Sequence, residues 1–115
     1  MYSDNEHFIN LYYENKLFGC NRKSRRPAIF VDRDGVIIKE KNYLSCVQEV
    51  ELEKGASNFL KSAFKLNIPL VIITNQSGIS RGFFSWNDYA NVTKKMMQLI
   101  GKENPIIGIF ANGLS

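Results

Sequence analysis

The sequence has little cysteine and no long apolar run, and both absences narrow the class of protein. No stretch reaches the roughly 18 consecutive apolar residues expected of a membrane-spanning helix, so we expect no membrane span. Only Cys20 and Cys46 are present, without the spacing of a zinc site or a disulfide framework. The N-terminus lacks the basic start, apolar block and cleavage site of a secretory signal. These absences predict a cytoplasmic protein with reduced thiols.

The composition is that of one small globular domain. The 115 residues are 44% hydrophobic and 23% charged, which argues against disorder. The formal net charge is +4, and residues 1–26 hold five Lys or Arg against three Asp or Glu. We interpret residues 1–26 as an N-terminal extension with a basic linker, and residues 27–115 as the domain. A solvated leader explains the basic stretch better than a nucleic-acid partner does.

Three short apolar runs have the length and composition of strands. They are Ala28–Val31, Pro69–Ile73 and Ile106–Phe110. Runs that are apolar on both faces are typical of parallel strands covered by helices on both sides.

Helical periodicity fills the gaps between these runs. An apolar stripe predicts a helix over about residues 55–66, and Ser85 is a good N-cap for a second helix that ends at Gly101. The looser spacing within residues 1–17 suggests a short amphipathic helix there. Alternating strands and helices predict an α/β fold with an open parallel sheet, in which ligands bind beyond the carboxyl ends of the strands.

Two carboxylates follow the first strand directly, in Asp32-Arg33-Asp34-Gly35. Mg²⁺ is typically bound by one or two carboxylates together with phosphate oxygens. Gly35 would allow the sharp turn that brings the backbone near a ligand. A plain turn at the end of a strand is the alternative interpretation of this motif alone.

A second polar motif, Thr74–Gly82, follows the second strand. Its hydroxyls and amides can donate hydrogen bonds to a phosphate, and its glycines let the backbone approach. An ordinary Gly/Ser loop is the alternative. Two such motifs at the ends of neighbouring parallel strands favour a phosphate and magnesium site.

The two motifs resemble motifs I and II of the haloacid dehalogenase-type phosphatases, and more closely those of the heptose bisphosphate phosphatases. The resemblance covers about residues 27–110 and implies a three-layer, Rossmann-like parallel sheet, incomplete here, with about three strands. It also implies an Mg²⁺-dependent hydrolase that removes the 7-phosphate of heptose 1,7-bisphosphate, in the supply of heptose for lipopolysaccharide. No membrane partner is implied.

The resemblance assigns a role to each motif residue. Asp32 would be the nucleophile that forms an aspartyl-phosphate, Asp34 the general acid and base, and both would bind Mg²⁺. Thr74 and Asn75 would donate hydrogen bonds to the phosphoryl group. The other residues expected to contact phosphate or substrate are Arg33, Gln76, Ser77 and a flap formed by Glu40, Lys41, Asn42 and Tyr43. In the flap, Asn42 departs from the glycine usual in the family, and a solvated hairpin tip is the alternative.

The resemblance also implies two further motifs that have no counterpart among residues 1–115. Motif III would supply a Lys or Arg to the phosphate and motif IV a further Asp to the metal, and no zinc loop is present. We therefore expect a truncated phosphatase of doubtful activity, or a remnant that binds phosphate or a partner without turnover. The strand Ala28–Val31 would then be an exposed apolar edge, which a second copy or a partner could cover.

Two other enzyme activities remain open at this point. Histidinol-phosphatases usually carry Asp-Gly where this chain has Ser77-Gly78. The polynucleotide 3′-phosphatases share Thr-Asn-Gln but usually carry a hydrophobic residue in place of Arg33. Salt-dependent binding to DNA would favour the latter.

Overall fold

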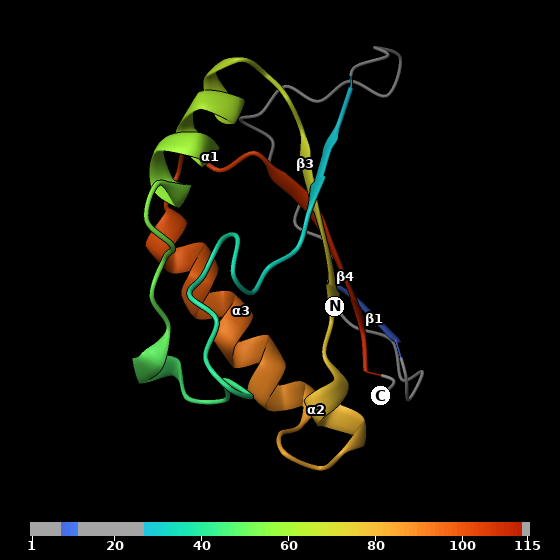
Figure 1. The fold of residues 1–115 in the computed structure, drawn as a ribbon. Coiled ribbons are helices and arrows are strands. Elements are labelled where there is room, and N and C mark those ends of the chain that lie inside the picture. Colours follow the sequence, from blue (N-terminus) through green and yellow to red (C-terminus); the bar gives the residue numbers. More distant parts are fainter. Residues whose placement is uncertain (1–7, 12–26, 114–115) are drawn as a thin grey trace.

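The computed structural model describes residues 8–11 and 27–113, which form one four-stranded sheet with helices packed against it (Figure 1). The strands are β1 (Phe8–Leu11), β2 (Ile29–Val31), β3 (Leu70–Asn75) and β4 (Ile106–Asn112). The helices are α1 (Ala56–Lys65), α2 (Ser77–Ser80) and α3 (Trp86–Ile100), with a 3₁₀ turn, η2, at Val47–Glu49. In these ranges no helix has the length and apolar character that crossing a bilayer requires.

The three strands expected from the apolar runs are confirmed, and they are parallel. β3 lies in the centre, with Val31 of β2 opposite Ile72 and Phe110 of β4 opposite Ile73. The strand order is β1-β4-β3-β2. Because β2 and β3 are parallel neighbours, the two polar motifs that follow them emerge at the same edge of the sheet.

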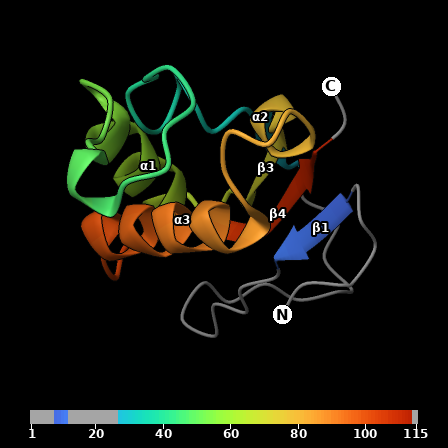
Figure 2. The same ribbon diagram turned by 90° about the horizontal axis from the view of Figure 1, so that it is seen from below.

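β1 corrects the helix expected within residues 1–17, because residues 8–11 are a strand. It pairs antiparallel with β4, with Phe8 opposite Asn112 and Leu11 opposite Ile109, and it forms one margin of the sheet (Figure 2). The helical spacing in this segment was loose, and the unpaired backbone edge of β4 offers hydrogen bonds that only an extended chain can use. The rest of the expected helix lies outside the described residues.

The two long helices lie on the same face of the sheet (Figure 1). α1 connects β2 to β3 and α3 connects β3 to β4, so both connections move across the sheet in one direction. Right-handed crossovers in one direction place their helices on one face. On the opposite face Phe30 is 63% exposed and Ile73 is 52% exposed. The described residues therefore supply two of the three expected layers.

The core lies between the sheet and the apolar faces of α1 and α3. Leu60 of α1 and Met96 of α3 are fully buried against Ile72 of β3 and Ile109 of β4. The predicted N-cap at Ser85 is confirmed and is part of a capping box: the Ser85 hydroxyl accepts from the Asp88 N–H at 3.1 Å, and the Asp88 carboxylate accepts from the Ser85 N–H at 3.0 Å. This box fixes where α3 begins, directly after the loop that carries the second motif.

Candidate active site

A cavity of about 340 Å³ lies at the carboxyl ends of β2 and β3. Three segments that are distant in the sequence meet around it: the turn after β2, the flap and the loop after β3. Its lining residues are Asp32, Arg33, Asp34, Glu40, Lys41, Asn42, Tyr43, Leu44, Asn75, Gln76, Ser77, Gly78 and Phe84. A volume of this size is typical of a small-molecule site.

The first motif forms a tight turn that presents the Asp32 carboxylate to solvent. The backbone N–H of Arg33 donates to Asp32 Oδ1 at 2.7 Å. The N–H groups of Ile37 and Ile38 both donate to the Arg33 carbonyl, so the chain folds back within four residues. Gly35 has a φ of 83° in this turn, a conformation that glycine adopts without the strain of a Cβ.

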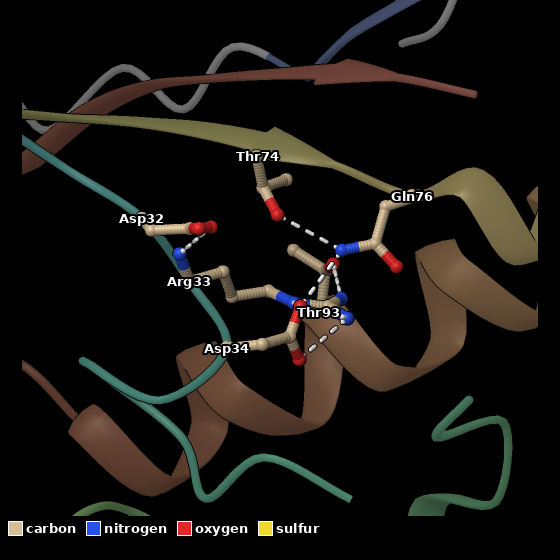
Figure 3. A network of polar contacts seen from close by, with 6 residues as sticks. All are labelled: Asp32, Arg33, Asp34, Thr74, Gln76 and Thr93. Carbon is tan, nitrogen blue, oxygen red and sulfur yellow. Dashed lines mark hydrogen bonds and ion pairs between the residues drawn. The ribbon is translucent and has the colours of Figure 1, made fainter. Parts of the chain in front are cut away.

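The Asp34 carboxylate is held from two sides (Figure 3). Gln76 Nε2 donates to Asp34 Oδ2 at 2.8 Å and also lies 2.9 Å from Thr74 Oγ1. Arg33 approaches the same carboxylate, with Nη2 at 3.1 Å from Oδ1 and Nε at 3.3 Å from Oδ2. The two motifs are thus joined by a direct hydrogen bond between the side chains of Gln76 and Asp34.

Arg33 and Thr74 lie differently from what their expected roles suggest. The Arg33 side chain is only 1% exposed, and its guanidinium group contacts Asp34 and the α3 residue Thr93. Thr74 is 3% exposed and does not line the cavity, and its hydroxyl accepts from Gln76. Asn75, in contrast, is exposed at the end of β3 and lines the cavity, as Ser77 does.

The flap is fastened to the loop after β3 through Tyr43. The rings of Tyr43 and Phe83 stack with their centroids 4.4 Å apart, and Arg81 Nη1 donates to the Tyr43 hydroxyl at 3.1 Å. Tyr43 itself has a φ of 51°, an uncommon backbone conformation for a residue with a side chain. Nothing in the sequence singled out Phe83 or Arg81 for this contact, although Arg81 belongs to the second motif and Phe83 follows it directly.

The base of the flap carries an exposed charge cluster. Lys39 and Lys41 both pair with Glu51, at 3.2 Å each, and Lys41 also donates to the Glu49 carbonyl. Hydrogen bonds from Lys41 and then Lys39 lower the pKa of the Glu51 carboxyl from its ordinary value. The Lys41 ammonium, expected to contact substrate, is therefore paired with Glu51 in this structure.

The chain is similar in sequence to curated phosphatases. No family model matches the chain. The D-glycero-beta-D-manno-heptose-1,7-bisphosphate 7-phosphatase of Helicobacter pylori (strain ATCC 700392 / 26695) is 41% identical over 76 residues, which are 66% of this chain and 44% of that protein. The protein of that name in Escherichia coli (strain K12) is 34% identical over 85 residues, 73% of this chain and 44% of that protein.

Solved structures give the fold. A Mesorhizobium loti protein described as a HAD-like phosphatase superposes with a TM-score of 0.84 at 28% identity, over 96% of this chain and 52% of that one. The chain has the haloacid dehalogenase-like fold. The D,D-heptose 1,7-bisphosphate phosphatase of B. bronchiseptica, complexed with magnesium and phosphate, has the same fold with a TM-score of 0.68 at 22% identity, over 77% and 51% of the two chains.

The resemblance inferred from the two motifs is confirmed by these phosphatases. The haloacid dehalogenase-like chain described here spans less than half of the length of the curated relatives just named. It also spans about half of the two solved structures.

Proposed function

We propose that this chain carries the nucleophile and the phosphate-binding loop of a phosphomonoesterase that acts on the 7-phosphate of D-glycero-D-manno-heptose 1,7-bisphosphate. One observation carries the proposal: the exposed Asp32 carboxylate opens onto the same cavity as Asn75 and Ser77. A carboxylate beside uncharged hydrogen-bond donors suits attack on a phosphate monoester. The names of the curated relatives support the choice of sugar.

The chemistry divides into two displacements at phosphorus. In the first, Asp32 attacks through Oδ2, since Oδ1 already accepts the Arg33 N–H. The P–O bond to the sugar breaks, the leaving alkoxide takes the proton that Asp34 carries at the start of this step, and an aspartyl-phosphate forms on Asp32. In the second, Asp34 takes a proton from water, whose oxygen attacks phosphorus and releases inorganic phosphate and Asp32. Asn75 and Ser77 donate hydrogen bonds to the phosphoryl oxygens in both steps.

The donor set fits a magnesium ion that keeps several water or phosphate ligands. The described residues contain no group of three His, Cys, Asp or Glu side chains that could enclose a metal. The Asp32 carboxylate is available, whereas the Asp34 carboxylate is engaged by Arg33 and Gln76. Asp32 would therefore hold Mg²⁺ through its carboxylate and Asp34 through its backbone carbonyl. When bound, the ion offsets the negative charge of the phosphoryl oxygens.

Phosphate release from heptose 1,7-bisphosphate tests the proposal, with Mg²⁺ present and after chelation. We expect release that depends on Mg²⁺ and disappears in Asp32→Asn, which keeps the shape of the side chain but removes the nucleophile. Trapping the phosphoenzyme after an acid quench would locate the phosphoryl group on Asp32. A folded chain that releases no phosphate and forms no phosphoenzyme would overturn the proposal.

A further inference from the structure

Arg33 is a fully buried cation that follows Asp32 and precedes Asp34 in the sequence. Its side chain is 1% exposed and is among the largest of the fully buried side chains in the described residues. A charged group out of water is tolerated only where it is paired and hydrogen-bonded. The partners of the guanidinium group therefore indicate what this residue does.

On one side, the Arg33 guanidinium group contacts two residues of α3. Arg33 Nη1 donates to Thr93 Oγ1 at 3.1 Å, and the guanidinium carbon lies 4.8 Å from the centroid of the Tyr89 ring. Tyr89 and Thr93 are four residues apart and so share one face of the helix. Both are fully buried. α3 thus provides a rigid support that holds the guanidinium group by a hydrogen bond and a cation–π contact.

The partner on the other side is Asp34. Arg33 Nη2 lies 3.1 Å from Oδ1 and 3.2 Å from Oδ2 of that carboxylate, and Nε lies 3.3 Å from Oδ2. Gln76 donates to Oδ2 from the opposite motif. A fork of donors on one side and an amide on the other leave the carboxylate little freedom to rotate. Asp34 is 23% exposed, so its oxygens still face the cavity.

We propose that Arg33 is a positioning residue: it fixes the Asp34 carboxylate against α3 for proton transfer and does not bind the substrate phosphate. The inference rests on the proposed function in so far as it concerns proton transfer. The inference adds Thr93 to the residues that support the site. Thr93 lies 60 residues from Arg33 in the sequence and does not line the cavity.

The first test needs no activity. Thr93→Val removes the hydroxyl that anchors Arg33 and keeps the branched shape, whereas Thr93→Ser keeps the hydroxyl and serves as the matched control. The ¹³Cγ resonance of Asp34, assigned by its loss in Asp34→Asn, should shift in Thr93→Val and stay in place in Thr93→Ser. An unchanged resonance in Thr93→Val would overturn the proposal, whether or not the chain hydrolyses phosphate.

The second test uses the leaving group. A sugar alkoxide must be protonated as it departs, whereas the p-nitrophenolate of p-nitrophenyl phosphate departs without a proton. In Arg33→Met, phosphoenzyme formation from heptose 1,7-bisphosphate should fall by about 10- to 100-fold. This loss is no larger than the lower end of the roughly 10²- to 10⁴-fold that general acid catalysis contributes, because Asp34 itself is still present. The same step with p-nitrophenyl phosphate should change less than about threefold. KM for the sugar should stay near the wild-type value.

Two outcomes of the second test count against the inference. An equal loss with both substrates would mean that Arg33 supports the fold or the nucleophile rather than Asp34. A raised KM with unchanged kcat would mean that Arg33 binds phosphate. Arg33→Lys should recover part of the sugar-specific rate, because an ammonium group can still reach one carboxylate oxygen. A folded wild-type chain that releases no phosphate and forms no phosphoenzyme would refute the proposed function, while the Asp34 resonance would still decide the positioning role.

Discussion

Gly78 packs against the ring of Tyr43 so closely that a Cβ at position 78 would lie 2.7 Å from Tyr43 Cδ1. The two residues belong to different segments of the site, since Gly78 lies in α2 and Tyr43 ends the flap. Phe84 crowds the same position, because its Cε1 would lie even closer to a Cβ at position 78. The absence of a side chain at position 78 is what lets the flap lie against the second motif.

We expect Gly78→Ala to push the flap away from the loop after β3. Tyr43 and Phe84 would both have to move, and overpacking of this kind costs roughly 1–3 kcal/mol of stability. The free energy of urea unfolding and the affinity for phosphate should both decrease. Ser80→Ala, in the same short helix but exposed, is the matched control and should change stability by less than about 0.5 kcal/mol. Equal stability of the two variants would contradict the packing argument.

Gln76→Glu should destabilise the chain although it hardly alters the shape of the side chain. The new carboxylate would stand where Gln76 Nε2 now donates to Asp34 at 2.8 Å, in a residue that is 5% exposed. A lost hydrogen bond and a facing like charge together cost about 1–3 kcal/mol. Urea unfolding at neutral pH measures the loss, and Gln48→Glu is the same substitution at an exposed position. If both variants were equally stable, the Asp34–Gln76 contact would not be structurally important.

Ser85→Ala should weaken the start of α3 by about 1 kcal/mol, the usual cost of losing an N-cap. The Ser85 hydroxyl accepts from the Asp88 N–H at 3.1 Å, and alanine would leave that donor without its cap. Thermal unfolding would register a lower midpoint. Ser62→Ala, at an exposed position inside α1, removes the same hydroxyl without touching a cap and should be neutral or slightly stabilising.

The contribution of Glu51 to stability should depend on pH. Its pKa is lowered in the folded chain from 4.5, so the ionised form favours folding. This stabilisation is present above about pH 4.5 and is lost as the pH falls through the lowered pKa. The difference in urea midpoint between wild type and Glu51→Gln should therefore shrink between pH 7 and pH 3, and salt should reduce it. A difference that stayed constant with pH would show that the Lys39 and Lys41 pairs contribute nothing.

The sequence predicted where most helices and strands lie better than it predicted which strands pair and where the helices pack. Apolar runs and helical stripes located β2, β3, β4, α1 and α3, because local hydrophobic periodicity and the cap at Ser85 are sufficient for that. A helix was expected where β1 lies, because the strand structure of β1 depends on the edge of β4, which is about 100 residues away in the sequence. The placement of α1 and α3 on the same face of the sheet follows from the order of the strands. Hydrophobic periodicity gives no information about strand order.

The candidate site shows the same division. Sequence motifs selected Asp32, Asn75 and Ser77, and the structure lines one cavity with all three. They gave no indication that Arg33 would be buried, since a charged residue between two aspartates is ordinarily exposed. The stack of Tyr43 on Phe83 was also missed, because nothing local distinguishes a ring that packs on a distant loop from one that faces solvent.

The sequence separation of the residues that hold Asp34 also affects when the site forms during folding. Gln76 and Asp34 are 42 residues apart in the sequence, and Arg33 and Thr93 are 60 apart. Contacts of such separation are made only after the intervening chain has closed, which costs entropy early and delays the contacts that depend on it. The hydrogen bonds that hold the Asp34 carboxylate should therefore form late, after β2, β3 and α3 have packed together. A fragment of the chain that lacks one of these elements cannot form all of them.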